Sequence, residues 1–224
     1  MIGFRILKRR RAIGADMIAA FRALPVANIS DSMARMTAAG ARLRPMHAGG
    51  VMAGPALTVK TRPGDNLMLH KALDLAVAGD VVVCDAGGDL TTALIGEMML
   101  SIAIRKKLGG VIINGAIRDA GFINSSPFPV YAAGVTHRGP YKDGPGEINV
   151  PIAIGGMVIE PGDLIVGDDD GFVCVPFDHA DVVLKATKTK HAAETKQLAE
   201  INAGKDDRAW VDATLKRLGC EVEG

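Results

Sequence analysis

The sequence predicts an α/β domain with a mixed sheet and peripheral helices. In the middle of the chain, short apolar runs typical of buried strands alternate with amphipathic stretches typical of helices. Between residues 128 and 176, several strand-like runs follow one another without a helix, so part of the sheet is expected to be antiparallel. No linker or low-complexity segment divides the 224 residues, so we expect one domain spanning 1–224.

The expected elements follow in order along the chain. A first helix is predicted over 16–24, stopped by Pro25, and a second short helix follows with Ser30 or Asp31 as its cap. Strand-like runs are found at 50–66, 80–88, 111–115, 128–135 and within 148–176. Helical spacing is found at 66–80 and 91–110, and the chain becomes helical and charged over about 178–218.

Composition narrows the class of protein. The formal net charge is +1 and 48% of residues are hydrophobic, which provides a sizeable core and no electrostatic signal for nucleic acid or membrane. The basic run at 8–11 is short, and we interpret it as a solvated end. Cys84 and Cys174 lie in apolar runs and are expected to be small core residues. Three widely spaced cysteines and the lack of a signal-like stretch predict a cytoplasmic protein.

Polar residues at the ends of predicted buried strands are the candidates for chemistry, since GxGxxG, P-loop, HExxH and GxSxG motifs are all absent from the sequence. Asp85 and Asp89 follow one strand, Arg118 and Asp119 follow the next, and Glu97 follows Gly96 near a helix start. Strand ends that face helix N-termini are where α/β sheets gather ligands. We therefore expect the site at this edge of the sheet.

The residue types suggest distinct roles. The planar guanidinium of Arg118 matches a carboxylate, and Asp119 is a hard oxygen ligand suited to Mg²⁺ or Mn²⁺. Because Mg²⁺ keeps several waters, one direct ligand is enough, with Asp85 or Glu97 holding waters. Backbone N–H groups of the segment 96–99 would attract an anion at the helix start. A structural surface ion pair of Arg118 with Asp119 is the alternative.

Other residues have simpler interpretations beside the functional ones. Lys60 would serve a Schiff-base aldolase, but an edge-strand lysine is the commoner explanation. The acidic run 168–170 is interpreted as a turn rather than a metal site, and the similar segments 79–88 and 162–171 as recurrent turn chemistry. The pair His137-Arg138 fits either a distal carboxylate contact or a solvated loop. His47, His70, His179 and His191 share no metal spacing and receive no site role. Met68, Met98 and Met99 fit core filling better than any cofactor box.

Glu97, twenty residues and then Arg118-Asp119 form a pattern that resembles the (D/E)-x20-R-D signature of class II pyruvate aldolases in the RraA-like family. These include 4-hydroxy-4-methyl-2-oxoglutarate and 4-carboxy-4-hydroxy-2-oxoadipate aldolases, which also decarboxylate oxaloacetate. The stretches PGDNLMLHKALDLAVAGDVVVCDAGG, GEMML, GGVIINGAIRDA and PGDLIVGDDDGFVCVP resemble family stretches in family order. The resemblance therefore covers most of the chain.

The resemblance implies a fold, a chemistry and an assembly. The fold would be a swivelling β/β/α type, with Arg118 on the pyruvate carboxylate, Asp119 on Mg²⁺ or Mn²⁺, and further substrate contacts from Gly96, Glu97, Met98 and Met99. The partners would be a 2-oxo acid and further copies of the chain, in a homotrimer or hexamer, with neither nucleic acid nor membrane. Glu194 would complete a neighbouring chain's site, and the segment 178–218 would pack on that neighbour. The alternative within the family is a non-catalytic regulator that binds RNase E or another protein.

Overall fold

One mixed sheet of ten strands organises the computed structural model, which describes residues 2–221. A separate antiparallel hairpin is formed by β9 (Ile152–Ile154) and β10 (Met157–Ile159). The sheet strands are β1 (Arg5–Ile6), β2 (Arg44–Pro45), β3 (Met52–Thr61), β4 (Val81–Asp85), β5 (Ala93–Ile95), β6 (Gly110–Ile117), β7 (Val130–Val135), β8 (Gly146–Ile148), β11 (Leu164–Asp168) and β12 (Gly171–Val175). The predicted α/β class with a mixed sheet is confirmed.

The helices alternate with strands in the first half and gather at the end of the chain. They are α1 (Ala15–Arg22), α2 (Val26–Ser32), α3 (Leu67–Leu75), α4 (Glu97–Arg105), α5 (Ala120–Asn124), the 3₁₀ helix η1 (Phe177–His179), α6 (Ala180–Asn202) and α7 (Ala209–Arg217). The chain divides into two compact units, one ending at Thr187 and the other beginning at Lys188. The boundary falls within α6, and α7 belongs to the second unit.

The central strands run in the order β8-β3-β4-β6-β7. β3, β4, β6 and β7 are parallel, as βαβ crossovers require, whereas β8 and β11 pair antiparallel with β3. β5 pairs parallel with the far end of β6, beyond a register shift. The carboxyl ends of β5 and β6 therefore lie side by side, and the chain leaves them at Gly96 and Arg118.

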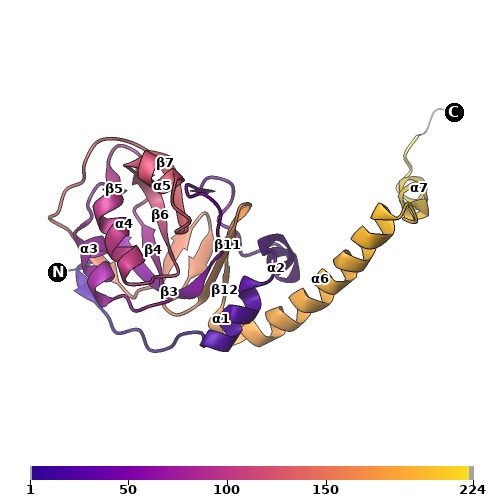
Figure 1. The fold of residues 1–224 in the computed structure, drawn as a ribbon, viewed down its shortest axis with the longest axis horizontal. Coiled ribbons are helices and arrows are strands. Elements are labelled where there is room, and N and C mark those ends of the chain that lie inside the picture. The colour runs from indigo at the N-terminus through magenta and orange to yellow at the C-terminus, as the bar shows by residue number, and fades with distance from the viewer. Residues whose placement is uncertain (1, 222–224) are drawn as a thin grey trace. The chain divides into compact units, whose positions relative to one another are not determined.

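Three apolar clusters stabilise this arrangement. α3 and α4 pack on one face of β4 and β6, where Leu69, Leu73 and Leu100 are buried, and Figure 1 shows both helices on that side. The β9–β10 hairpin packs against a second cluster that contains Ile112 and Tyr131. α1 and α2 lie beside β11 and β12 over a third cluster (Figure 1). Cys84 and Cys174 are buried as predicted, and Cys220 is exposed.

Two predicted elements were wrong in their extent. The segment 91–110 is not one helix, because residues 93–95 form strand β5 and the helix starts at Glu97. The second helix begins at Val26, so Ser30 and Asp31 lie inside it rather than at its cap. The Val26 N–H donates instead to Asp168 Oδ2 at 2.9 Å, so a side chain from a distant turn satisfies this helix end. Asp168 ends β11, and Asp169 and Asp170 form the turn before β12, so the interpretation of this acidic run as a turn is confirmed.

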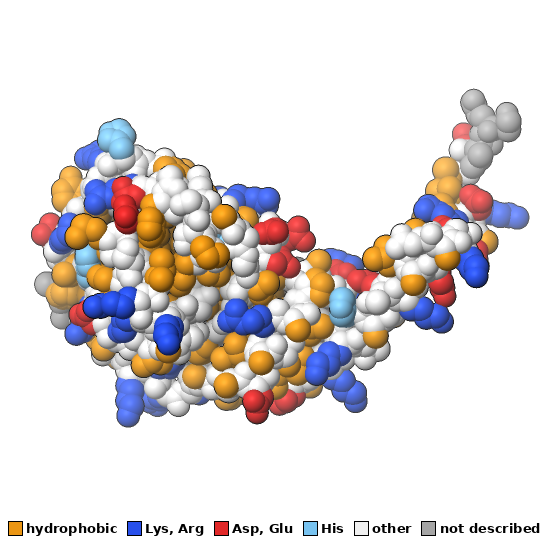
Figure 2. All heavy atoms as spheres, in the orientation of Figure 1, with side chains coloured by type: hydrophobic (Ala, Val, Ile, Leu, Met, Phe, Trp, Pro, Cys, Tyr) orange, Lys and Arg blue, Asp and Glu red, His pale blue; other side chains and the backbone are white. Residues whose placement is uncertain are grey.

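The basic run 8–11 is not a solvated end. Arg9 forms an ion pair with the buried carboxylate of Asp80 at 2.7 Å, and Arg11 contacts Glu160 and Asp178, each at 2.8 Å. The N-terminal segment is thus fixed along the first unit. On the face that Figure 2 shows, basic and acidic side chains are interspersed rather than gathered by sign.

In the second unit, the helical character predicted for the C-terminal segment is confirmed by the later turns of α6 and by α7. Its packing on a neighbouring subunit stays a prediction. Among residues 2–221, none of the helices has the length and apolar character needed to cross a membrane.

Candidate active site

Arg118 and Asp119 leave the carboxyl end of β6 in a turn that differs from regular structure. The Arg118 N–H donates to Ile95 O at 3.0 Å, which ties the turn to β5. Asp119 has φ 57° and ψ 41°, the left-handed region that non-glycine residues rarely adopt. Backbone strain of this kind is commonly concentrated at functional sites. Here it accompanies a carboxylate that reaches back to the start of α4.

The corner between β5 and α4 receives that carboxylate. The Glu97 N–H donates to Asp119 Oδ2 at 2.9 Å. A Cβ atom at Gly96 would overlap the Asp119 carboxylate and lie 2.9 Å from Arg118 Cγ. Glycine is therefore required at 96 because both motif side chains cross its surface.

Arg118 and Asp119 are adjacent without being locked together. Arg118 Nε lies 3.7 Å from Asp119 Oδ2, too long for a hydrogen bond, and the two side chains are 45% and 40% exposed. A tight structural ion pair would consume both charges. The loose geometry leaves the guanidinium available to a ligand carboxylate.

The donor set fits a hard divalent cation. The side-chain contacts of Asp119 within the described residues all use Oδ2, so Oδ1 is left for a ligand. Over residues 2–221, no group of three or more His, Cys, Asp or Glu side chains could hold a metal ion. A single carboxylate beside open space suits Mg²⁺ or Mn²⁺, which keep waters in their coordination shells. Asp119 is the residue here that could hold such an ion.

A cavity of about 640 Å³ opens beside this corner. Gly96, Glu97, Met98, Met99 and Arg118 all line it, so the structure brings together the predicted substrate contacts. Met98 is 81% exposed, so the interpretation of Met98 as core filling was wrong: it lies on the solvent side of the first turn of α4. Met99 and Met68 are buried, as predicted.

The same cavity contains residues to which sequence reasoning assigned no role. His70 on α3 and Lys142 in the loop before β8 line it together with Asn66. Burial lowers the pKa of His70, and the nearby charge of Lys142 lowers it further. The Asn66 side chain is buried and donates to Leu94 O at 2.8 Å. The sequence signal was the PGDN turn before α3, which places Asn66 and His70 at the start of a helix.

A smaller concavity of about 280 Å³ lies on the other side of the motif. It is lined by Arg118, Asp119, Val135, Thr136 and His137. Arg118 therefore borders both hollows, and His137 lies on the side of Asp119. The neighbouring Arg138 accepts a hydrogen bond at its carbonyl from Ala93 N–H at 2.8 Å, and its proposed contact with a distal carboxylate stays a prediction.

Two predicted acids have local structural partners. Asp85 Oδ1 accepts hydrogen bonds from Asn114 Nδ2 at 2.8 Å and from Gly87 N–H at 3.0 Å. Asp89 accepts from the backbone and hydroxyl of Thr91. These contacts are those of turn residues, and Glu97 is the better candidate for holding a water.

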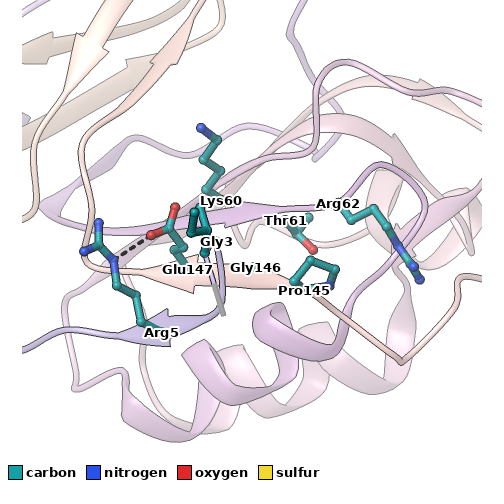
Figure 3. A pocket seen from close by; sticks show the side chains of 9 residues that line it. Gly3, Arg5, Lys60, Thr61, Arg62, Pro145, Gly146 and Glu147 are labelled. Atoms are coloured by element: carbon teal, nitrogen blue, oxygen red, sulfur yellow. Dashed lines mark hydrogen bonds and ion pairs between the residues drawn. The ribbon is translucent and has the colours of Figure 1, made fainter.

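Lys60 lies in a different place from the motif. β3 is paired on both sides, so the edge-strand explanation was wrong, and Lys60 is exposed because it lies at the carboxyl end of the strand. An exposed lysine lacks the desolvation that activates a Schiff-base amine. It lines a cavity of about 740 Å³ with Arg5, Arg62 and Glu147, shown in Figure 3. Glu147 is already paired with Arg5 at 2.6 Å, so this larger hollow offers no available acid.

Glu194 lies in the second unit, on α6, where its carboxylate is 2.7 Å from Lys190 Nζ. Such an i,i+4 pair is common on a helix surface. Its place in a neighbouring chain's site stays a prediction.

Comparison with known proteins identifies the relatives of this site. The family model described as RraA-like, Aldolase/RraA, matches residues 26–174, a range that contains the whole corner. A protein of Halalkalibacterium halodurans named "Putative 4-hydroxy-4-methyl-2-oxoglutarate aldolase" is 41% identical over 177 residues, which cover 79% of this chain and 84% of that protein.

Two further proteins similar to this chain are a relative named as an aldolase and a solved structure titled as an RNA-processing inhibitor. A Thermus thermophilus protein named "4-hydroxy-4-methyl-2-oxoglutarate aldolase" is 35% identical over 112 residues, covering 50% of this chain and 68% of that protein. The solved structure titled "Structure of the RNA-processing inhibitor RraA from Thermus thermophilis" superimposes with a TM-score of 0.61 at 28% identity, covering 68% of this chain and 92% of that one.

Proposed function

The chain belongs to the RraA-like family, and from that membership we propose that it is a divalent-metal-dependent lyase that cleaves a 4-hydroxy-2-oxo acid to pyruvate and a second 2-oxo acid. The same site would decarboxylate oxaloacetate. The observation that carries the proposal is the corner at Gly96, where an available guanidinium and a carboxylate with an open oxygen meet beside a cavity. The aldolase names of the relatives support the reaction class.

Substrate binding begins with the pyruvate half. Arg118 would hold the 1-carboxylate through two parallel N–H contacts and so orient the 2-oxo group towards Asp119. The N–H groups of Met98 and Met99, in the first turn of α4, have no partner within the helix and face an anion favourably. The groups that would bind the carboxylate thus lie beside residue 96, where only glycine leaves room for the Arg118 side chain.

Both reactions break a bond to the carbon next to the 2-oxo group and leave a pyruvate enolate. A divalent cation held by Asp119 would supply Lewis-acid stabilisation of that enolate charge. Arg118 keeps the carboxylate in plane and neutralises it while the bond breaks. The left-handed turn at Asp119 holds its carboxylate in position before substrate arrives.

Proton transfer is the role of Glu97. Its side chain is exposed at the cavity, close to the reacting corner through its own N–H contact with Asp119. Through a water, the Glu97 carboxylate would take the proton of the 4-hydroxyl as the C3–C4 bond breaks. The same proton would return to C3 of the enolate and yield the methyl group of pyruvate.

A second carboxylate fits the far part of the cavity. Lys142 is a cation that lines the cavity with Arg118, and His70 lies near it on α3. A dicarboxylic 4-hydroxy-2-oxo acid would place its pyruvate end at Arg118 and its distal carboxylate at Lys142. The names of these relatives specify an oxoglutarate derivative, which has this charge pattern.

The test measures the release of pyruvate from oxaloacetate and from 4-hydroxy-4-methyl-2-oxoglutarate, monitored through the coupled oxidation of NADH. Chelation should abolish release, and Mg²⁺ or Mn²⁺ should restore it. Full activity in EDTA, or a substrate adduct trapped by borohydride, would exclude this mechanism and favour a Schiff base.

A non-catalytic regulator is the second candidate, because the chain shares its fold with an RNA-processing inhibitor. A regulator would bind its protein partner without metal, and Asp119→Ala would leave that binding intact. Absence of pyruvate release from either substrate in Mg²⁺, together with metal-independent capture of an RNase E-type partner, would favour this candidate.

A further inference from the structure

The carboxylate of Asp65 is fully buried, at 0% exposure, in the turn between β3 and α3. Its Oδ1 accepts the Leu67 N–H at 2.9 Å, and its Oδ2 accepts the N–H groups of Asp143 at 2.7 Å and Gly144 at 2.9 Å. Arg62 Nη2 lies 3.0 Å from the same Oδ2. Burial by itself raises the pKa of Asp65, but these three N–H groups and Arg62 together hold it below its ordinary value. Asp65 is therefore ionised at neutral pH, and its buried charge is stabilised by these hydrogen bonds and by Arg62.

Two of these bonds fix the loop that carries Lys142. Asp143 and Gly144, which follow Lys142, are held by Asp65 Oδ2. Tyr141, which precedes it, donates its N–H to Gly64 O at 2.8 Å and accepts the Asn66 N–H at 3.0 Å. The backbone on both sides of Lys142 is thus bonded to residues 64–66.

The strand end beside this loop is held in the same way. The Arg62 N–H donates to Pro145 O at 3.2 Å, and Figure 3 shows Thr61 and Arg62 beside Pro145 and Gly146. The loop therefore has bonded backbone at Tyr141 on one side of Lys142 and from Asp143 to Pro145 on the other. Lys142 is the residue of this loop that is both charged and in the wall of the cavity that contains Arg118.

The third N–H bond connects the same carboxylate to the helix that carries His70. Leu67 is the first residue of α3, so Asp65 satisfies one of the free N–H groups at that helix end. One turn later, His70 faces the cavity. A single buried carboxylate thus sets the spacing between Lys142 and the start of the helix that carries His70.

We propose that Asp65 is a positioning residue that holds the Lys142 loop against the start of α3, and thereby gives the site its preference for dicarboxylic over monocarboxylic substrates. This rests on the proposed lyase function for the identity of the substrates. Asp65 itself is buried and does not touch them.

The test compares kcat and KM for 4-hydroxy-4-methyl-2-oxoglutarate, a dicarboxylate, and 4-hydroxy-2-oxopentanoate, in which a hydrogen atom replaces the distal carboxylate on C4. Asp65→Asn keeps the size of the side chain but removes its charge and one acceptor oxygen. It should raise KM for the dicarboxylate about fivefold to tenfold. Both kcat values and the KM of the monocarboxylate should stay within about twofold, because the Arg118 corner is untouched.

A double-mutant comparison separates positioning from general loosening. Lys142→Met should raise the dicarboxylate KM on its own, and adding Asp65→Asn to it should change the ratio of the two KM values by less than twofold. Asp163→Asn is the matched control. Asp163 is also buried and accepts backbone N–H groups, from Glu160 and Phe177 at 2.9 Å each, at a turn remote from the cavity in the fold. It should leave the ratio unchanged.

The inference is overturned if Asp65→Asn raises both KM values equally, if its effect persists in full without Lys142, or if Asp163→Asn reproduces it. Calorimetric binding of 2-oxoglutarate and 2-oxopentanoate in Mg²⁺ gives the same comparison without turnover. A protein that releases no pyruvate but prefers 2-oxoglutarate in an Asp65-dependent manner would refute the lyase function and keep the inference. A wild-type protein that shows neither cleavage nor preference would refute both.

Discussion

Replacing Gly96 by alanine should cripple the site without removing any functional group. The backbone at Gly96 has φ −152° and ψ −165°, an extended conformation that alanine adopts freely, so backbone strain contributes nothing. The added Cβ would overlap the Asp119 carboxylate and lie 2.9 Å from Arg118 Cγ. Carbon atoms in contact prefer about 3.5 Å or more, so Arg118 must move by at least about 0.6 Å and Asp119 by more.

Such a displacement reaches the tolerance of a catalytic arrangement, which is about 0.5 Å, and a 1 Å misplacement costs about 100-fold in rate. We therefore expect kcat/KM for pyruvate release to fall about 10- to 100-fold and the affinity for Mg²⁺ to weaken. The free energy of unfolding should fall by only about 1 kcal/mol, because the displaced side chains are partly exposed and can swing outwards.

Gly121→Ala is the matched control for this change. Gly121 lies in α5, two residues after Asp119, and an added Cβ there would meet nothing within 4 Å. It should leave turnover unchanged and stability equal or slightly higher. Measurements are coupled pyruvate release, calorimetric Mg²⁺ titration and thermal unfolding on all three proteins. Activity of Gly96→Ala within threefold of wild type would refute the reasoning, since it would mean that the positions of Arg118 and Asp119 are not critical.

Four further predictions concern the motif residues, Asp65, Arg138 and Glu194. Arg118→Ala should keep Mg²⁺ binding but lose about 2–4 kcal/mol of transition-state stabilisation, roughly 30- to 1000-fold in kcat/KM. Asp119→Ala should lose metal affinity and turnover together. If Arg118→Ala keeps activity within threefold of wild type, Arg118 is a structural residue. The lowered pKa of Asp65 contributes stability that is fully present above about pH 4 and is lost as the pH falls through the pKa of the folded state. In urea titrations, the difference in unfolding free energy between wild type and Asp65→Asn should therefore shrink below about pH 4. Arg138→Ala should raise KM for a dicarboxylic substrate far more than it weakens inhibition by pyruvate, and equal effects on both would place this loop outside substrate sorting. Glu194→Ala and Asp119→Ala should each be nearly inactive. If Glu194 acts across an interface, mixed rings of the two variants, made by reversible dissociation, should recover activity in about a quarter of the sites. No recovery, despite chain exchange proven by mass spectrometry, would place Glu194 in its own chain's site or in a structural role.

The parts of the fold that could be predicted are those set by local pattern. The continuous apolar run before Asp85 and the amphipathic stretch after Asn66 predicted β4 and α3 correctly. β5 was missed because three apolar residues that lead into a helix have no periodicity of their own. Its strand conformation depends on pairing with the far end of β6, which is a tertiary contact. The start of α2 was misplaced because its N–H partner, Asp168, comes from across the fold.

In the candidate site too, some residues could be predicted from the sequence and others depend on tertiary contacts. Glu97, Arg118 and Asp119 were predicted from their places at strand and helix ends, from residue type and from the resemblance to the RraA-like signature. The chain from Glu97 to Arg118 forms the helix and strand of one crossover. His70 and Lys142 were missed because no short-range pattern connects them. They meet where the turn at 64–66 pairs with Tyr141, far along the sequence. A cavity wall made by such pairing is visible only once the sheet order is known.

The two halves of the cavity therefore depend on different parts of the chain. The half proposed to bind pyruvate is held by β5–β6 register: the Arg118 N–H donates to Ile95 O, and the Glu97 N–H donates to Asp119 Oδ2. The distal half is held by the turn around Asp65, which belongs to neither strand. A substitution in the distal half can change which acid is accepted and leave enolate formation intact, whereas any change of register between β5 and β6 moves both motif residues at once. Relatives with altered substrates are thus expected to differ around the positions of Asn66, His70 and Lys142 and to keep glycine at the position of Gly96, because the close approach of the Arg118 and Asp119 side chains leaves no room there for a Cβ atom.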